Sequence, residues 1–506
     1  MVTKSVTATT AGINAYKVEV EVDVTNSLPG MCIVGLPDSA VNEARERVHS
    51  AIKNSGFSFP TGKVIVNLAP ADIRKEGTNF DLPIAVGILK EQGVDIPDSS
   101  TTAYIGELSL DGSLRKVNGV LSLVSGLKEI GINTFFVPKE NAKEAALVQD
   151  VNIYGAEHLR DIVNHFEEEP IPATKIDINK YLEECSVQEY TYDFKDVKGQ
   201  QKAKKALEIA AAGGHNLLMT GSPGAGKTMM AKCMASILPP LELKEALELT
   251  KIYSVCGLLS PNEPLMTKRP YRAVHHTASP NGIIGGGTNP KPGEISLAHR
   301  GVLFLDEMIE FPRQVLEVLR QPLEDGEVVI SRSKSSVRYP CQFMLLGAMN
   351  PCPCGYLGDR KKQCTCTDVQ IQRYKSRLSG PLLDRIDLVI SVPRLTTEEL
   401  TNNNIEAEPS AVIRERVVKA RKIQINRYKN EGILTNSELT PSMIKRYCKL
   451  DEEAGQILTS AVQKYQLSGR RYNRILKISR TIADLAGSEN IKTEHITQAL
   501  QYRADI

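Results

Sequence analysis

The sequence has no long hydrophobic run and no excess of charge of either sign. Its 506 residues hold no apolar stretch near the ~20 residues that a transmembrane helix needs, and the first residues lack the apolar core of a signal peptide. A formal net charge of +2 means that any nucleic-acid surface must be a local basic patch. Ten cysteines are too few for a disulfide scaffold in a chain of this size. We therefore expect a cytoplasmic protein with no membrane partner.

Changes of pattern along the chain divide it into four parts. Residues 1–166 alternate short strands and helices, and residues 167–190 are rich in Glu and Pro and then polar, as in a linker. Residues 191–395 contain the motifs of a nucleotide-binding core. Residues 396–506 begin with a polar joint and then show only helical patterns, which predicts a small helical lid domain.

Three elements are predicted within the N-terminal part. Residues 17–24 alternate polar and apolar side chains with period two, which predicts a half-buried strand, and a further strand is expected at 63–68. Residues 38–54 predict a helix, because their apolar residues have helical spacing. Those residues are Val41, Ala44, Val48 and Ile52.

One glycine-rich stretch indicates the chemistry of the core. Residues 221–228 read Gly-Ser-Pro-Gly-Ala-Gly-Lys-Thr and match the phosphate-binding pattern G-x-x-x-x-G-K-[ST], between a predicted strand at 216–220 and a predicted helix at 229–238. The loop N–H groups would wrap the phosphates of ATP, the Lys227 ammonium would contact the β- and γ-phosphates, and the Thr228 hydroxyl would bind Mg²⁺. The residues expected to bind the nucleotide are Gly221, Ser222, Pro223, Gly224, Ala225, Gly226, Lys227 and Thr228.

Two further strand ends carry side chains suited to hydrolysis. Residues 301–307 read Gly-Val-Leu-Phe-Leu-Asp-Glu, the pattern of a buried parallel strand whose carboxyl end reaches the nucleotide. Asp306 would hold Mg²⁺ through water, and Glu307 would orient and deprotonate the attacking water. A strand at 343–350 ends in Asn350, whose amide would hydrogen bond that water or the γ-phosphate.

Two arginines are candidates for catalytic roles in a ring. Arg385 follows a short helix at the place where an AAA+ ring presents an arginine to the nucleotide of the neighbouring subunit. The alternative is an ordinary ion pair with Asp384 or Asp387. In the C-terminal part, Arg474 is favoured among several arginines as the second sensor of the nucleotide, and a solvated basic helix face is the alternative.

Two short strands between Arg320 and Pro340 flank a basic tip. This arrangement looks like the hairpin before the first sensor in the MCM helicase and magnesium-chelatase branches of the AAA+ class. In a ring it would point into the central pore, where Arg332 and Lys334 would contact DNA phosphates. The alternative is a basic tip that only keeps a sheet edge soluble.

The segment 269–299 is rich in Gly and Pro and predicts a long loop with a short helix at its end. It contains His275 and His276. Adjacent histidines rarely converge on one ion, so a structural or pore-loop role is favoured over metal binding.

Four cysteines gather just after the sensor strand. Cys352 and Cys354 form one Cys-x-Cys pair, and Cys364 and Cys366 form another. Two such pairs can converge on a tetrahedral Zn²⁺ ion, which would be structural because four protein ligands leave no open position. Four reduced thiols and a disulfide are the alternatives.

Several stretches together resemble one bacterial family, the ComM/YifB proteins, which are magnesium-chelatase-like AAA+ ATPases. The stretches are 34–48, 66–72, 285–299 and 378–385, so the resemblance spans nearly the whole chain. It implies a homo-hexameric motor. The ComM branch is associated with DNA branch migration during natural transformation, whereas other members have no assigned role.

The N-terminal part also resembles the Lon protease domain, of the ribosomal S5-type α/β fold, at 104–119 and 132–141. A Lon site needs a Ser nucleophile in a Gly-Pro-Ser-Ala-Gly turn and a Lys base. Here the turn at 76–83 reads Glu-Gly-Thr-Asn-Phe-Asp-Leu-Pro, and the Lys position falls at Leu121. Covalent catalysis needs both groups. The domain is therefore expected to bind DNA or a partner, or to help form the ring.

The expected fold is α/β: a P-loop AAA+ core with a parallel sheet, an N-terminal Lon-protease-like domain and a C-terminal helical lid. The expected function is an ATP-dependent DNA motor, a branch-migration helicase acting on branched, single-stranded or duplex DNA. The alternatives are a protein-remodelling ATPase and a chelatase-type motor that inserts Mg²⁺ into a porphyrin.

Overall fold

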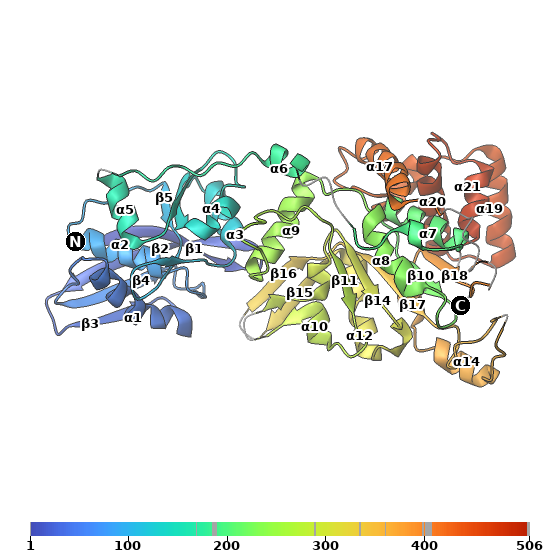
Figure 1. The fold of residues 1–506 in the computed structure, drawn as a ribbon, viewed down its shortest axis with the longest axis horizontal. Helices are drawn as coiled ribbons and strands as arrows, with labels where there is room; N and C mark the ends of the chain where they lie inside the picture. The colour runs from blue at the N-terminus through green and yellow to red at the C-terminus, as the bar shows by residue number, and fades with distance from the viewer. Residues whose placement is uncertain are drawn as a thin grey trace. The chain divides into compact units, whose positions relative to one another are not determined.

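The computed structural model describes residues 2–167, 169–184, 190–287, 290–332, 335–359, 361–396, 399 and 407–502. The chain forms two compact units (Figure 1). The first comprises Met1–Val187, Leu243–Thr267 and Ser331–Tyr339, and the second comprises Gln188–Glu242, Lys268–Ile330 and Pro340–Ile506. Each unit is thus assembled from separate stretches of the chain.

The first unit is built on a four-stranded sheet. Its strands are β1 (Thr3–Ala11), β2 (Asn14–Thr25), β3 (Gly30–Val34) and β4 (Lys63–Ala69), in the order β1-β2-β4-β3. The β3–β4 pair is parallel and the other two pairs are antiparallel. Alternate residues of β2 are buried, as its period-two pattern predicts. The strands predicted at 17–24 and 63–68 are confirmed.

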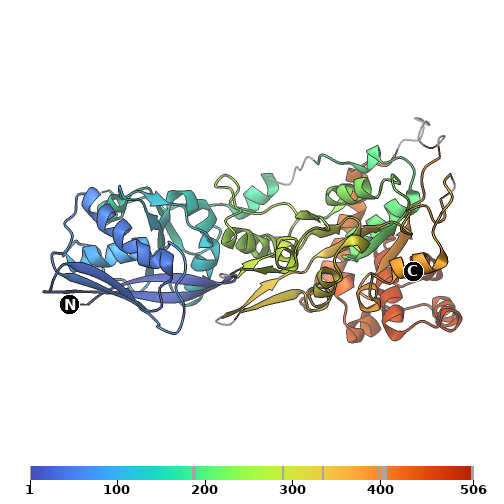
Figure 2. The same ribbon diagram turned by 90° about the horizontal axis from the view of Figure 1, so that it is seen from below.

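Helices lie on one side of this sheet (Figure 2). The helix predicted at 38–54 is confirmed as α1 (Ser39–Asn54), with all four predicted apolar residues buried. The Asp38 carboxylate caps it by accepting a hydrogen bond of 2.8 Å from the Val41 N–H. Helix α2 (Asp81–Glu91) packs beside α1 and against β1 and β2.

A second, parallel sheet completes the first unit. It pairs β5 (Thr102–Tyr104), β8 (Thr134–Pro138) and β9 (Asn152–Ala156). The remaining elements of residues 2–184 are the strand pair β6 (Glu107–Leu108) and β7 (Leu114–Arg115), and the helices α3 (Val120–Glu129), α4 (Lys139–Ala145), α5 (Leu159–Phe166) and α6 (Ile178–Glu184).

One helix of the first unit comes from far along the chain. Helix α9 (Leu243–Val255) packs on α3. The Lys251 ammonium donates a hydrogen bond of 3.0 Å to the Ser125 hydroxyl, and the Ser254 hydroxyl donates one to the buried Glu144 carboxylate. No local pattern in the sequence indicated that residues 243–267 belong with the N-terminal part.

The second unit contains a five-stranded parallel sheet. Its strands are β10 (Leu217–Thr220), β11 (Tyr271–Val274), β14 (Val302–Leu305), β17 (Met344–Met349) and β18 (Leu388–Ser391), in the order β11-β14-β17-β10-β18. Strands β14 and β17 are buried along their whole length, as central parallel strands are. The strands predicted at 216–220, 301–307 and 343–350 are confirmed.

The predicted loop at 269–299 is wrong over residues 271–274, because these form β11 at the edge of that sheet. Short elements follow: α10 (Pro280–Ile284), β12 (Gly285–Gly286), β13 (Lys291–Pro292) and α11 (Glu294–Leu297). The short helix predicted at the end of this segment is therefore present as α11.

The other short elements of residues 190–396 lie before and between these strands. They are η1 (Phe194–Asp196), η2 (Met308–Glu310), α12 (Arg313–Val318), α13 (Arg320–Asp325), α14 (Asp368–Lys375) and α15 (Gly380–Leu383), together with the hairpin strands β15 (Glu327–Arg332) and β16 (Ser335–Pro340). Strand β16 falls almost wholly in the first unit.

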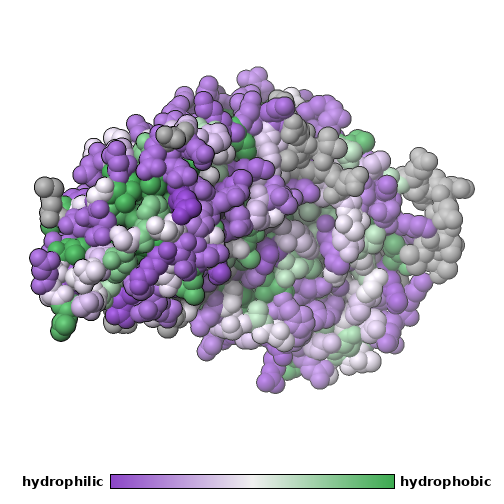
Figure 3. Space-filling view, turned by 60° about the vertical axis from the view of Figure 1, so that its left-hand side comes forward, coloured by the Kyte–Doolittle hydropathy of each residue, from purple (hydrophilic) through white to green (hydrophobic). Residues whose placement is uncertain are grey.

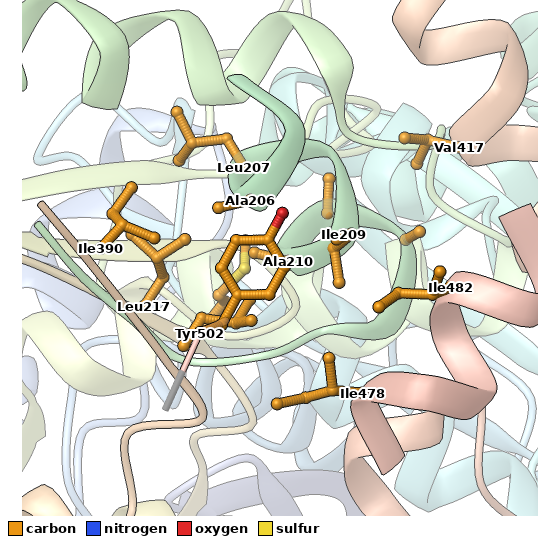
Figure 4. Packing of buried hydrophobic residues seen from close by; sticks show 14 of the residues in the cluster. Ala206, Leu207, Ile209, Ala210, Leu217, Ile390, Val417, Ile478, Ile482 and Tyr502 are labelled. Carbon is orange, nitrogen blue, oxygen red and sulfur yellow. The ribbon is translucent and has the colours of Figure 1, made fainter. Parts of the chain in front are cut away.

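The C-terminal helices share a core with the parallel sheet. They are α17 (Ser410–Arg427), η3 (Asn436–Glu438), α18 (Pro441–Tyr447), α19 (Glu452–Tyr465), α20 (Gly469–Leu485) and α21 (Thr493–Leu500). Helix α7 (Gln201–Gly213) lies between them and the sheet, and its Ile209 and Ala210 pack with Val417 of α17 and Ile482 of α20 (Figure 4). The predicted helical character is confirmed, because residues 407–502 contain no strand.

The visible face of the protein in Figure 3 is mostly hydrophilic. In the part of the chain that the structure describes, no helix combines the length and the apolar character needed to cross a bilayer.

Candidate nucleotide site

The glycine-rich loop joins β10 to α8 (Lys227–Ile237), so the predicted helix is confirmed and begins at the motif lysine. Gly224 and Gly226 have φ values of 77° and 89°, a region that favours glycine. A Cβ atom on Gly221 would come within 2.2 Å of the Val392 carbonyl oxygen. The loop therefore needs glycine both for its backbone turns and for close approach to the end of β18.

The buried Lys227 side chain lies across this loop. Its ammonium donates hydrogen bonds to the carbonyl oxygens of Gly221 at 2.6 Å and Ser222 at 3.1 Å, and to Asn350 Oδ1 at 3.2 Å. Burial lowers the lysine pKa, and the negative charges of Asp306 and Glu307 oppose that change. The lysine and the predicted sensor amide are therefore in direct contact.

The predicted Mg²⁺ ligands also meet. The Thr228 hydroxyl donates a hydrogen bond of 2.8 Å to Asp306 Oδ2. An oxygen pair of this kind, one hydroxyl and one carboxylate, suits the hard Mg²⁺ ion, which is held by few protein ligands and several waters. Strand order explains the meeting, since β14 and β17 lie beside β10 and the carboxyl ends of parallel strands share one edge.

Glu307 sits just beyond β14 in an unusual conformation. Its φ of 49° lies in the left-handed region, which side-chain-bearing residues seldom adopt. Its backbone N–H donates to Asp306 Oδ1 at 3.0 Å, and its carboxylate is exposed. Asp306 and Glu307 thus point differently, the first toward Thr228 and the second toward solvent at the site.

His276 is a site residue that the sequence reasoning missed. Its Nδ1 lies 3.7 Å from Glu307 Oε2, because β11 is the sheet neighbour of β14. Its ring is 4.1 Å from that of His275, whose Nδ1 is 2.9 Å from the Thr277 hydroxyl. Recognising residues 271–274 as a strand is the signal that would have placed His276 here.

The two predicted arginines lie near each other. Arg385 pairs with the Glu324 carboxylate of α13, rather than with Asp384 or Asp387. Arg474 is buried, and its guanidinium donates to the Asp384 carbonyl oxygen at 2.6 Å. Burial lowers the Arg474 pKa, opposed by the nearby aspartates. Arg474 therefore anchors the backbone that carries Arg385.

Of the two predicted DNA-contact residues, one lies in the hairpin that β15 and β16 form. Val328 and Ile330 of β15 and Val337 and Tyr339 of β16 are buried, which fixes one face of the hairpin. Arg332 is the last residue of β15, and Lys334 lies outside the described residues.

The four cysteines converge. Their sulfur atoms all lie within 4.8 Å of one another, and they are the one group of three or more candidate metal ligands found among the described residues. Cys352 Sγ is 3.4 Å from Cys354 Sγ and 3.7 Å from Cys364 Sγ. These separations are near the ~3.8 Å edge of a tetrahedron with Zn–S bonds of about 2.3 Å. All four cysteines are free, so the disulfide alternative is not what the structure contains.

Backbone N–H groups donate to sulfur atoms of this cluster and favour the thiolate at Cys354, whereas, despite their own backbone hydrogen bonds, burial and the neighbouring thiols raise the pKa values of Cys364 and Cys366. The Cys354 N–H donates to Cys366 Sγ at 3.4 Å, and the Cys366 N–H donates to Cys364 Sγ at 3.5 Å. Backbone hydrogen bonds from Thr365 and Tyr356 lower the pKa of Cys354 to about 5. The donor set therefore fits a soft, tetrahedral ion such as Zn²⁺.

The Lon-like positions of the first unit carry structural contacts. The Asn79 amide donates to the Ala8 carbonyl oxygen at 2.8 Å, and Asp81 is buried and paired with Arg47. Leu121 is buried in α3.

Comparison with known families gives matches along most of the chain. The family described as "Magnesium chelatase, subunit ChlI" matches residues 193–400. The families described as "Subunit ChlI of Mg-chelatase" and "Magnesium chelatase, subunit ChlI C-terminal" match residues 20–141 and 407–503.

Among individual relatives, the Competence protein ComM of Haemophilus influenzae is 45% identical over 97% of this chain and 96% of its own length. The Uncharacterized protein YifB of Escherichia coli is 40% identical over 97% of this chain and 95% of its own length. The Magnesium-chelatase subunit ChlI homolog of Methanocaldococcus jannaschii is 25% identical over 47% of this chain and 69% of its own length.

The parallel sheet, the P-loop and the family matches define the class, which is the magnesium-chelatase-like AAA+ proteins. Within that class, the chain belongs to the ComM/YifB family. The α/β fold and the resemblance expected from the sequence are therefore confirmed.

Proposed function

We propose that the protein hydrolyses ATP at this site with Mg²⁺. The observation that carries the proposal is the meeting of Lys227, Thr228, Asp306 and Asn350 at one edge of the sheet. In this assignment Lys227 and the loop N–H groups bind the phosphates, while Thr228 and Asp306 hold Mg²⁺. Glu307 activates the attacking water. Asn350 hydrogen bonds to that water or to the γ-phosphate, and it also contacts Lys227.

The finer function that we propose is a homo-hexameric, cytoplasmic DNA motor. ATP hydrolysis would drive branch migration of recombining DNA during natural transformation. The support is the similarity to a relative named Competence protein ComM, together with a hairpin strand that ends at Arg332 and the basic Lys334 two residues further along the sequence. Contacts of those side chains to DNA phosphates would be independent of base sequence.

A ring also needs groups that act between subunits. We assign Arg385 as the arginine that reaches the neighbouring nucleotide and Arg474 as the second sensor. Because Arg474 anchors the Asp384 backbone, we propose that it acts by placing Arg385. The Arg385–Glu324 pair would open when the arginine engages a neighbouring phosphate.

A second cofactor site is proposed at the four cysteines. Zinc is the ion that the tetrahedral sulfur set favours. With four thiolates bound it would be structural, since no coordination position stays open for a substrate.

A chelatase-type motor is the alternative that one observation favours, namely the magnesium-chelatase description of the matching families. A protein-remodelling ATPase is the third candidate. Both predict ATP hydrolysis that branched DNA does not stimulate.

The deciding experiment is ATP hydrolysis with and without a synthetic Holliday junction, followed by separation of the junction into duplex arms. We expect stimulation, arm separation with ATP but not with a non-hydrolysable analogue, and junction affinity that falls steeply with salt. Glu307→Gln is the matched control, because it should bind the junction yet leave it intact. Failure to bind or separate the junction at low salt would favour protein remodelling.

A further inference from the structure

The cysteine loop lies against the phosphate-binding loop. A Cβ atom on Gly355 would come within 2.8 Å of Pro223 Cδ, and Gly355 has a φ of 83°. The Lys361 N–H donates to Asp359 Oδ1 at 2.8 Å, and this hydrogen bond and the nearby hydroxyl of the buried Ser222 lower the pKa of Asp359. Two residues of the P-loop thus have neighbours inside the loop that the cysteines enclose.

The same loop holds the end of the sensor strand. The buried Cys352 follows Asn350 by two residues, and the position of a Gly355 Cβ is 3.9 Å from Asn350 Cγ. Asn350 in turn accepts the hydrogen bond from Lys227. The cysteine loop therefore touches three of the residues proposed to surround the phosphates.

Between Asn350 and Thr367 the described residues form neither helix nor strand. Their backbone hydrogen bonds are local turns, such as Gly355 N–H to Cys352 O at 2.9 Å and Asp359 N–H to Tyr356 O at 3.0 Å. Irregular loops of this length keep large conformational entropy, so a cross-link among their four thiolates would be their strongest constraint.

We propose that zinc at Cys352, Cys354, Cys364 and Cys366 braces the nucleotide site. The ion fixes the loop, and the loop fixes Ser222, Pro223 and Asn350 in the geometry that receives the phosphates. Zinc content would thereby regulate ATP binding although no cysteine contacts the nucleotide. The inference rests on the proposed ATP site, but the brace itself is a property of the protein without nucleotide.

Four preparations test the brace by metal analysis and by titration with a fluorescent ATP analogue. These are the purified protein, the protein stripped by a zinc chelator, the stripped protein restored with zinc alone, and Cys364→Ser. We expect one zinc per chain at the start. We also expect stripping or Cys364→Ser to weaken ATP binding roughly tenfold, the loss expected for one charge-assisted hydrogen bond, with recovery on zinc addition. Cys32→Ser is the matched control, since Cys32 is also half-buried but lies in β3.

Two further variants separate zinc binding from the effect of zinc on ATP binding. Asp359→Asn removes the negative charge beside Ser222, and Gly355→Ala strains the contact with Pro223. Both should keep zinc yet bind ATP more weakly. Retention of full ATP affinity by the zinc-free protein, or zinc content near zero with four titratable thiols, would overturn the proposal.

Hydrogen exchange of peptides covering residues 217–228 tests the effect of zinc on the P-loop independently of ATP binding, because it is measured without nucleotide. Exchange should rise when zinc is removed. If the zinc-loaded protein binds no ATP, the proposed function is wrong. If hydrogen exchange does not change when zinc is removed, the proposal that zinc stabilises the nucleotide site is wrong as well.

Discussion

His276 Nδ1 lies 3.7 Å from Oε2 of Glu307, so a side chain from the segment just after the edge strand β11 contacts the proposed catalytic carboxylate. An imidazole at this distance competes with water for access to the carboxylate. The pair therefore links the accessibility of Glu307 to the position of the segment that follows β11.

We expect His276→Ala to raise basal ATP hydrolysis several-fold while leaving ATP affinity unchanged, because Glu307 loses its competing partner. Steady-state kinetics and nucleotide titration measure the two effects. His275→Ala is the control, since that imidazole bonds to Thr277 instead. Equal effects of both variants would mean that the His276–Glu307 contact has no special role.

Lys227→Ala should abolish tight ATP binding, whereas Glu307→Gln should bind ATP normally and lose at least about a hundredfold in kcat, as expected for removal of a general base. The reason is the division between the phosphate-binding ammonium and the water-activating carboxylate. Equilibrium binding and single-turnover hydrolysis distinguish them. Normal turnover by either variant would show that the site is misassigned.

Arg385→Ala should bind ATP and lose about 10³-fold or more in hydrolysis if the arginine acts on the neighbouring subunit. Mixing it with Lys227→Ala chains should restore part of the activity, because each supplies what the other lacks at a shared interface. Glu324→Gln is the control: a purely structural ion pair predicts that it costs as much as Arg385→Ala. If mixed assemblies recover no ATP hydrolysis at any ratio, the assignment of Arg385 to the neighbouring nucleotide is wrong.

Replacing both Arg332 and Lys334 by Ala should lower DNA-stimulated hydrolysis and junction separation but spare the basal rate. The two charges would contact phosphates, so the slope of log affinity against log salt should fall by about two. Binding titrations at several salt concentrations measure this slope. A loss of basal hydrolysis would indicate general damage instead.

Glu144 predicts a pH dependence of stability in the first unit. Burial raises its pKa, against the lowering effects of Ser254, Leu121 and Asn141. A raised folded-state pKa means that protonation favours the fold, so this contribution is fully present at low pH and is lost as pH rises through the folded-state pKa. Relative to Glu144→Gln, the wild-type Tm should therefore rise as pH is lowered from neutral toward 5. A difference that is independent of pH would contradict this reading of Glu144.

The sequence predicted what local patterns encode. The strands ending at Thr220, Asp306 and Asn350, the helix from Lys227 and the cysteine cluster all follow from periodicity or motif spacing. The parallel strand order then explains why separate motifs meet.

What the sequence did not predict depends on contacts between distant segments. Strand β11 is short and lies in a Gly/Pro-rich stretch. The sequence pattern therefore predicted neither its pairing with β14 nor the position of His276. The carboxylate that pairs with Arg385 is on α13, and the buried Arg474 donates to a backbone carbonyl oxygen. Residue type alone indicates neither contact.

The membership of α9 in the first unit bears on how the protein is synthesised. The buried face of α9 includes Ala246, Leu249 and Ile252, and it follows the P-loop helix in the chain. Domains usually fold in order as they leave the ribosome. Here the N-terminal unit gains α9 only after the nascent chain has passed Val255, and it is complete only after Tyr339. A fragment cut at the linker would leave α3 without its partner on one side and α9 without its partner on the other, so the full chain is the unit in which folding and activity should be studied.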